Sequence, residues 1–288
     1  SVGDPIASHF MNEADLMVVL GASFSNHTGI SSYKPIVQVD FDPAQLGRFH
    51  AVTHPLLGEI GQTVRLVQAA LGGRSRCRDH TDEVADKWAT WRREKASRAR
   101  DDRGHGISSA AVFDALTRVA PRDAILPVDV GNNTYAFGRY FEVDRQAVLM
   151  SGYLGSIGFA LPAALGAWAA TTGADPRFRG RKVISVSGDG GLGQYLAEIT
   201  TLVKYGMNVC HVVLNNAQLG KITKEQRGGE WPVWQTSLVN PNFARFAEDC
   251  GARGIRAERE DELLAALEAG IGHDGPALVE VMTDPDLV

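Results

Sequence analysis

Short apolar runs alternate along the chain with segments whose apolar residues recur at helical spacing. The apolar runs predict buried strands over residues 15–20, 36–40, 123–131, 182–188, 208–216 and 276–282. The second kind of segment predicts helices over residues 61–71, 108–120, 161–170, 193–206, 240–251 and 260–271. Strands that alternate with helices in this way favour an α/β protein with two doubly wound parallel sheets.

A polar stretch divides this pattern into two regions. Residues 72–83, GGRSRCRDHTDE, contain two adjacent glycines, and the charged run WRREKASRAR at 91–100 predicts a helix with a solvated face. We therefore expect a first domain over residues 1–72, a linker with a charged helix over 73–105, and a second domain over 106–288. The chain opens without Met, one element before its first clear strand, so we expect the first region to be about half of a doubly wound domain.

Composition narrows the classes of partner. The formal net charge is −5, which argues against a surface for nucleic acid or anionic membranes. No apolar stretch reaches the roughly 20 residues that span a bilayer, and the first residues show no leader pattern. Cys77, Cys210 and Cys250 lie far apart and lack the spacing of metal ligands, which is typical of a reducing compartment. We expect a cytoplasmic protein.

One glycine-rich segment, KVISVSGDGGLGQYL, has the form of a nucleotide-binding turn. Gly188, Gly190 and Gly193 give the pattern G-x-G-x-x-G between an apolar strand and a helical pattern. A dinucleotide site also needs an acidic residue at the end of the next strand, about 20 residues on. That strand ends instead in Asn215 and Asn216, which weighs against an NAD-dependent oxidoreductase and leaves it as an alternative.

Asp189 and Asn216 follow two neighbouring predicted strands. Because the carboxyl ends of parallel strands meet at one edge of a sheet, we expect these two side chains to lie close together. A carboxylate and an amide oxygen beside a helix N-terminus suit Mg²⁺ shared with a phosphate group, and Gly190 and Gly191 would let the backbone approach that phosphate. Each residue alone is equally typical of a tight turn. The combination G-D-G, 24 residues and N-N favours the metal and phosphate site.

This combination, GDGG followed by LNNAQLG, resembles the thiamine diphosphate motif. The segments VDVGNNTYAFGRYF, SGYLGSIGFALPAALGA, NFARFAEDCGARGIR and GPALVEV resemble the diphosphate-binding domain of the pyruvate oxidase and acetolactate synthase family. The segments ADLMVVLGASFS, IVQVDFDPAQLG and LLGEIG resemble the second half of that family's central domain. The resemblance implies a thiamine-diphosphate-binding fold preceded by part of a Rossmann-like central domain.

The resemblance also implies a role for individual residues. Asp189, Asn216 and the backbone carbonyl of Gln218 would be Mg²⁺ ligands, completed by two diphosphate oxygens and a water. Ile157 would be the bulky apolar residue that bends the cofactor into a V, and the Gly155 backbone would accept a hydrogen bond from its 4′-amino group. Further cofactor-binding positions implied by the resemblance are Asn132, Asn133, Ser156, Gly188, Gly190, Gly191, Leu219 and Gly220.

The family activity that the resemblance implies is decarboxylation of a 2-oxo acid such as pyruvate, with thiamine diphosphate and Mg²⁺. In this family the Glu that activates the cofactor comes from a separate N-terminal pyrimidine-binding domain or chain, and no residue here can be assigned that role. We therefore expect this chain alone to bind cofactor weakly and to turn over nothing. The intact enzyme is expected to be a homodimer or homotetramer, and a non-catalytic or regulatory fragment is the alternative.

Three further features bear on the branch of the family. The oxidase branch uses FAD, and residues around Ser23–His27 and Asp40–Asp42 would face its adenosine part, so FAD stays open. Trp231 and Trp234, in KEQRGGEWPVWQ at 224–235, would either line a substrate entrance or anchor an exposed loop. His211 falls in a predicted buried strand, and we interpret it as a packed core residue.

Overall fold

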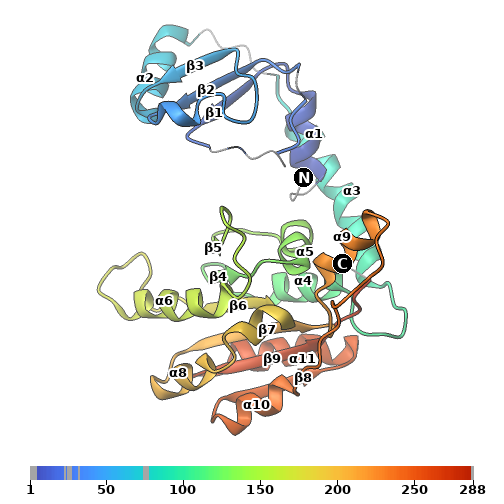
Figure 1. Ribbon diagram of the computed structural model, residues 1–288. Coiled ribbons are helices and arrows are strands. Elements are labelled where there is room, and N and C mark those ends of the chain that lie inside the picture. The colour runs from blue at the N-terminus through green and yellow to red at the C-terminus, as the bar shows by residue number, and fades with distance from the viewer. Residues whose placement is uncertain (1–4, 23, 25–27, 32, 74–77, 287–288) are drawn as a thin grey trace. The chain divides into compact units, whose positions relative to one another are not determined.

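The structure, a computed structural model, describes residues 5–22, 24, 28–31, 33–73 and 78–286. The chain divides into two compact units, residues 1–92 and 93–288, and the boundary falls inside helix α3 (Thr81–Ala99) (Figure 1). This charged helix lies within the region that the sequence predicts as a linker. Each unit is built around its own parallel sheet.

The N-terminal unit contains a small parallel sheet. Its elements are α1 (Pro5–Glu13), β1 (Met17–Leu20), β2 (Ile36–Asp40), the 3₁₀ turn η1 (Pro43–Gln45), β3 (His54–Leu57) and α2 (Ile60–Leu71). The strand order is β1-β2-β3, and Ile36 and Val39 of the central strand are buried. The expected strands at 15–20 and 36–40 and the helix at 61–71 are confirmed. The sequence did not predict β3, whose four residues include a proline and show no alternation.

The C-terminal unit contains a six-stranded parallel sheet in the order β5-β4-β6-β7-β9-β8. Its strands are β4 (Ile125–Val128), β5 (Ala147–Met150), β6 (Val183–Gly188), β7 (Val209–Asn215), β8 (Arg253–Ala257) and β9 (Ala277–Met282). Its further helices are α4 (Ser109–Val119), α5 (Asn132–Tyr140), α6 (Ala160–Thr172), α7 (Asp189–Gln194), α8 (Glu198–Lys204), α9 (Gly220–Gly228), α10 (Phe243–Asp249) and α11 (Glu260–Ile271). The predicted α/β class with two parallel sheets is confirmed.

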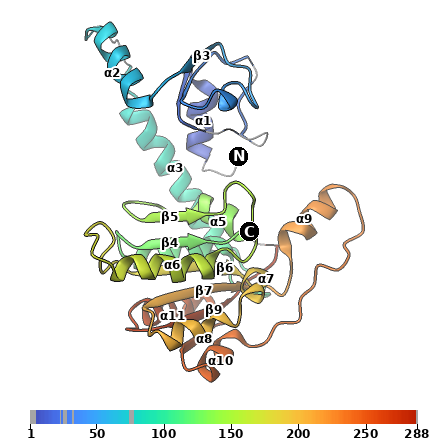
Figure 2. The same ribbon diagram turned by 60° about the vertical axis from the view of Figure 1, so that its left-hand side comes forward.

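Helices cover both faces of this sheet (Figure 2). Leu161 of α6, Leu192 of α7, Ile199 of α8 and Phe243 of α10 belong to one buried apolar cluster. On the other face α4 packs against α5 and α11. The sheet is therefore buried on both sides, which explains why its central strands are continuous apolar runs rather than alternating ones.

The strand order reverses at β4. The chain passes from β4 to β5 on one side, and it later returns to β6 on the other side of β4. In open α/β sheets the carboxyl ends of the strands at such a reversal leave a crevice in which ligands bind. Residues that directly follow β4 and β6 therefore lie at the binding edge of the sheet.

One predicted helix is wrong. The apolar spacing of residues 193–206 predicts a single helix, whereas the structure has α7 and α8 with a turn at 195–197 between them. The first of these helices contains three glycines, which have low helix propensity, and the chain leaves helical geometry at Tyr195. The ring of Tyr195 packs directly over Gly158, where a Cβ would lie 2.7 Å from it. This tertiary contact accompanies the break, and no periodicity of the chain reveals it.

Four other elements of this unit were not predicted. They are α5, β5, α9 and β8. The two helices begin at Asn132 and Gly220, which are typical turn residues, and the two strands are short. The segment at 224–235 is therefore not an exposed loop throughout. Its first five residues belong to α9, and irregular chain begins after Gly228.

His211 lies fully buried in β7, so the prediction of a packed core residue is confirmed. Its Nδ1 lies 2.7 Å from the hydroxyl of Ser185, and its Nε2 lies 2.9 Å from the hydroxyl of Ser187. Both ring nitrogens thus have partners inside the sheet. Burial disfavours the charged imidazolium and lowers the pKa of His211 to about 3.

This burial predicts a pH-dependent stability. Between the ordinary pKa of about 6.5 and the folded value of about 3, the unfolded chain binds a proton at His211 that the folded chain does not. Wild type should therefore lose about 1.4 kcal/mol of unfolding free energy per pH unit in that window, relative to His211→Gln. Urea unfolding at pH 7.5, 6.0 and 5.0 measures this difference. His105→Gln changes an exposed side chain and is the control; a pH-independent difference for His211→Gln would refute the prediction.

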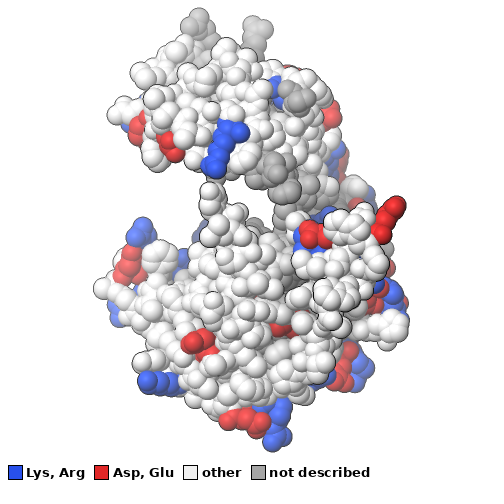
Figure 3. Space-filling view, viewed as in Figure 1, with Lys and Arg blue, Asp and Glu red and all other residues white. Residues whose placement is uncertain are grey.

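The surface carries charges of both signs. On the face shown in Figure 3, Lys and Arg are interspersed with Asp and Glu, and no broad patch of one sign is seen. Among the described residues, no helix combines the length and apolar character needed to cross a membrane.

Candidate functional site

A cavity of about 410 Å³ lies at the carboxyl ends of β4, β6 and β7, at the reversal of strand order. Four segments form most of its lining: the chain between β4 and α5, residues near 155–157, the start of α7, and the chain from the end of β7 into α9. Ser109 and Thr283 complete it. The topology thus places segments nearly 100 residues apart in the sequence around one hollow.

The cavity brings together all but one of the residues predicted for the site. Its lining includes Asn132, Asn133, Gly155, Ile157, Gly188, Asp189, Gly190, Gly191, Asn216, Gln218, Leu219 and Gly220. Ser156 is not among the lining residues; its side chain is exposed, and its backbone N–H donates to the hydroxyl of Ser151. Proximity is what the structure establishes here, and the ligand roles of these residues remain predictions.

Three helices begin at the cavity. Gly131, Gly188 and Leu219 precede α5, α7 and α9, and none of these three residues caps its helix through a side chain; at the start of α7 the carboxylate of Asp189 accepts from the N–H of Gly190. The first backbone N–H groups of a helix have no partner within the helix, and the aligned peptide dipoles make that end positive. An anion such as a diphosphate can supply the missing acceptors.

The absence of a side chain at Gly220 keeps two of these helix starts close. A Cβ on Gly220 would lie 2.7 Å from Nδ2 of Asn132, so the first turn of α9 contacts the first turn of α5. A larger residue would displace Asn132 within the cavity. Glycine at this position therefore permits the close approach that a small anion between two helix ends requires.

Asp189 is the carboxylate of the cavity lining, and it is 3% exposed. Its Oδ1 accepts from the backbone N–H of Gly190 at 2.9 Å, and its Oδ2 accepts from Nδ2 of Asn240 at 2.7 Å. Burial raises the pKa of Asp189, because loss of water disfavours the charged form. A cation bound at this carboxylate would offset that penalty.

The chain after β7 supplies further oxygen atoms. Oδ1 of Asn216 accepts from the backbone N–H of Gln218 at 3.0 Å. The carbonyl of Gln218 accepts from the backbone N–H of Gly220 at 2.9 Å. No group of three or more His, Cys, Asp or Glu side chains is placed to hold a metal in the part of the chain that the structure describes. A cation here would depend on amide and backbone oxygens beside one carboxylate, a set that suits Mg²⁺.

Sequence reasoning missed Asp129, which directly follows β4 and is 1% exposed. Its Oδ1 accepts from the backbone N–H groups of Val130, Gly158 and Phe159 at 2.7, 2.8 and 3.2 Å. Its Oδ2 has no hydrogen-bond partner among the described residues, and burial raises the pKa of this carboxyl. Asp129 thus fixes the turn that carries Ile157. In the sequence, the one indication of this role is that an acidic residue lies near the end of a predicted strand.

Ile157 is 45% exposed although it is a large aliphatic residue, and it lines the cavity. Ile157 is therefore not packed in the apolar core of the sheet. Trp231 and Trp234 are 67% and 71% exposed and are not among the lining residues. Asn240 is a second residue that sequence reasoning missed, because it lies 51 positions from Asp189 and its context predicts only a helix start.

The positions considered for FAD lie in the N-terminal unit. Asp40 is buried, and its Oδ1 accepts from the backbone N–H of Asp42 at 2.9 Å. In the range Ser23–His27, residues 23 and 25–27 lie outside the described residues. These contacts give no indication of a bound flavin, so FAD stays a prediction.

Comparison with known proteins gives two family matches. Residues 129–281 match the C-terminal TPP-binding domain of thiamine pyrophosphate enzymes, and residues 1–67 match the central domain of the same enzymes. A Bacillus subtilis protein described as thiamine pyrophosphate-containing is 31% identical over 98% of this chain and 48% of its own length. The acetolactate synthase isozyme 3 large subunit of Escherichia coli is 29% identical over 92% of this chain and 46% of its own length. The chain thus spans about half the length of the curated relatives it matches.

Proposed function

Because this chain belongs to the thiamine pyrophosphate enzyme family, we propose that it supplies the Mg²⁺- and diphosphate-binding part of an enzyme that decarboxylates a 2-oxo acid. The observation that carries this proposal is the cavity at the reversal of strand order, where the starts of α5 and α9, which Gly131 and Leu219 do not cap through a side chain, lie beside the buried carboxylate of Asp189.

The residues present fit the two charged groups of such a cofactor complex. The starts of α5 and α9 would receive the diphosphate, with Asn132 and Asn133 as additional donors. Asp189, Asn216 and the carbonyl of Gln218 would hold Mg²⁺, which prefers oxygen ligands and is commonly shared with substrate phosphates. The metal would compensate both the buried carboxylate and the phosphate charge.

The organic part of the cofactor would lie against the turn at residues 155–158. Gly155 has a φ of +63°, and its backbone would accept from the 4′-amino group, while the exposed side chain of Ile157 would support the bent conformation. Asp129 holds this turn through two backbone N–H groups. When bound, thiamine diphosphate stabilises the carbanion left by decarboxylation; this chain binds, orients and desolvates it.

We propose a pyrimidine-binding domain, or a further chain that carries one, as the partner that completes the site. Tyr153 and Leu154, directly before Gly155, are 82% and 80% exposed, which leaves large apolar side chains uncovered next to the proposed cofactor position. The relatives extend to about twice the length of this chain, which leaves room for such a domain. A homodimer or homotetramer would bring it to the cavity.

Among the reactions of the family, condensation of two 2-oxo acids is the first to assay, because several relatives bear the name acetolactate synthase. Oxidation of pyruvate with FAD is the second candidate. A non-catalytic role of this piece remains the alternative if no complementing domain restores turnover.

Isothermal titration of thiamine diphosphate into the chain, with Mg²⁺ and with EDTA, tests the proposal. We expect weak binding that requires Mg²⁺, no binding of unphosphorylated thiamine, and no turnover of pyruvate. NADH serves as the probe for the dinucleotide alternative. Absence of thiamine diphosphate binding at millimolar concentration by folded protein, or binding that EDTA leaves intact, would refute the proposal.

A further inference from the structure

The residues 236–240 run alongside the loop that follows β7. The backbone N–H of Leu219 donates to the carbonyl of Thr236 at 2.7 Å, and the N–H of Leu238 donates to the carbonyl of Ala217 at 2.7 Å. Gln218 and Ser237 form an antiparallel bridge between these two contacts. We call residues 236–240 the clamp segment. It holds the loop that contains Asn216 and Gln218 in one conformation.

The conformation that the clamp segment holds is an unfavourable one. Ala217 has a φ of +53°, in the left-handed region that residues with a Cβ rarely adopt. Its N–H donates to Oδ1 of Asn215 at 3.2 Å, and its carbonyl accepts from Leu238. Strained backbone of this kind persists only where surrounding contacts over-determine it, and it gathers at functional sites.

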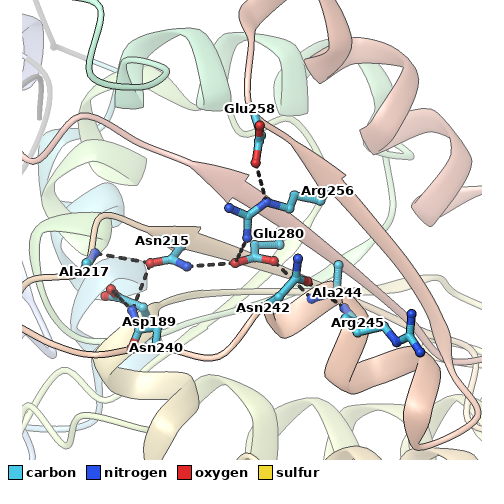
Figure 4. A network of polar contacts seen from close by, with 10 residues as sticks. All are labelled: Asp189, Asn215, Ala217, Asn240, Asn242, Ala244, Arg245, Arg256, Glu258 and Glu280. Carbon is cyan, nitrogen blue, oxygen red and sulfur yellow. Dashed lines mark hydrogen bonds and ion pairs between the residues drawn. The ribbon is translucent and has the colours of Figure 1, made fainter.

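Asn240, at the end of the clamp segment, joins this loop to the start of α7. Its Nδ2 donates both to Oδ2 of Asp189 at 2.7 Å and to Oδ1 of Asn215 at 2.9 Å (Figure 4). One amide group thus spans the two strand ends from which the proposed metal ligands come. Because an amide nitrogen carries two hydrogens, these two acceptors use the full donor capacity of Asn240.

The far end of the network is anchored in the sheet. Nδ2 of Asn215 donates to Oε1 of the fully buried Glu280 at 2.8 Å, and Arg256 lies 2.8 Å from the same oxygen. Glu280 in its charged form only accepts, so Asn215 must turn its amide nitrogen to Glu280 and its oxygen to Asn240. Asn240 must then donate toward Asp189. Glu280 therefore determines the direction of each hydrogen bond from Asn215 through Asn240 to Asp189.

We propose that Asn240 is a positioning residue for Asp189. The amide of Asn240 holds Oδ2 of that carboxylate and leaves its remaining lone pairs oriented for a divalent cation. The same amide holds Asn215, so the carboxylate and the loop that contains Asn216 and Gln218 keep a fixed relative position. This inference rests on the proposed function, since it assigns Asp189 to Mg²⁺. Partners of this kind, which orient a metal ligand without touching the metal, typically change metal affinity by about 10- to 100-fold when removed.

The test compares Asn240→Ala with Asn242→Ala. Asn242 lies in the same stretch of chain, but its Oδ1 caps α10 by accepting from the N–H of Arg245 at 2.8 Å, so its loss weakens the fold without touching Asp189. The readout is the Mg²⁺ concentration that gives half-maximal binding of thiamine diphosphate in calorimetry. We expect Asn240→Ala to raise it about 10-fold or more. Asn242→Ala should leave it within about twofold, because Asn242 caps α10 and is not among the residues that line the cavity.

Asn240→Leu is the second variant, because it keeps a side chain branched at Cγ and replaces the amide by apolar methyl groups. It should show the same rise as Asn240→Ala. An unchanged Mg²⁺ requirement in either folded Asn240 variant, or an equal rise in Asn242→Ala, would overturn the positioning role while leaving the proposed function intact. If wild type itself binds no thiamine diphosphate at any Mg²⁺ concentration, both the function and this inference are overturned.

Discussion

Asp189→Ala is expected to abolish Mg²⁺-dependent binding of thiamine diphosphate. The variant removes the carboxylate of the cavity lining, and the remaining amide and backbone oxygens carry no formal charge. Without that charge the divalent cation is not retained, and the diphosphate then faces the helix starts without the metal that bridges it. Calorimetric titration of the folded variant with thiamine diphosphate and Mg²⁺ measures the loss.

The same variant should not unfold the protein. Burial raises the pKa of Asp189, so alanine relieves the desolvation penalty of this carboxylate, while the N–H of Gly190 and Nδ2 of Asn240 lose an acceptor. The two effects oppose each other, so urea unfolding should give an apo stability within about 1–2 kcal/mol of wild type. Asp249→Ala, at an exposed Asp that pairs with Arg245, is the control and should keep full binding. Retained Mg²⁺-dependent binding in Asp189→Ala would contradict the assignment of the metal.

Glu280→Ala is expected to lower the free energy of unfolding by about 3–5 kcal/mol, as for other buried ion pairs that lose one partner. Glu280 is fully buried and serves three donors: Asn215, the backbone N–H of Ala244 at 3.1 Å, and Arg256. Its removal leaves all three without this acceptor at a position where the wild-type side chain is fully buried. Equilibrium urea unfolding at pH 7.5 measures the change.

Glu258→Ala provides a matched control, because Glu258 contacts the same arginine. Its carboxylate lies 2.8 Å from Nε of Arg256, but the side chain is 61% exposed. Exposed ion pairs contribute about 0–1 kcal/mol, so the free energy of unfolding of Glu258→Ala should lie within about 1 kcal/mol of the wild-type value. Equal effects of the two variants would show that the charge of Arg256, rather than the burial of Glu280, determines the contribution of the network.

The sequence alone predicted the features that depend on local periodicity and on the ends of strands. Apolar runs marked the central strands, because a strand covered on both faces needs no polar side. Asp189 and Asn216 follow β6 and β7, two neighbouring parallel strands, and the carboxyl ends of parallel strands lie at the same edge of the sheet. For that reason the two residues meet at one cavity, as expected. His211 was placed in the core on the same grounds.

Only the tertiary structure decided which distant segments meet there. The strand order places the chain after β4 beside the chain after β6, and this order is not encoded in any local pattern. The same holds for the contact of Gly158 with Tyr195 at the helix break, and for Asp129 and Asn240, whose partners lie 29 and 51 residues away. The physical reason is that periodicity depends on neighbours along one element, whereas such hydrogen bonds depend on the path of loops between elements.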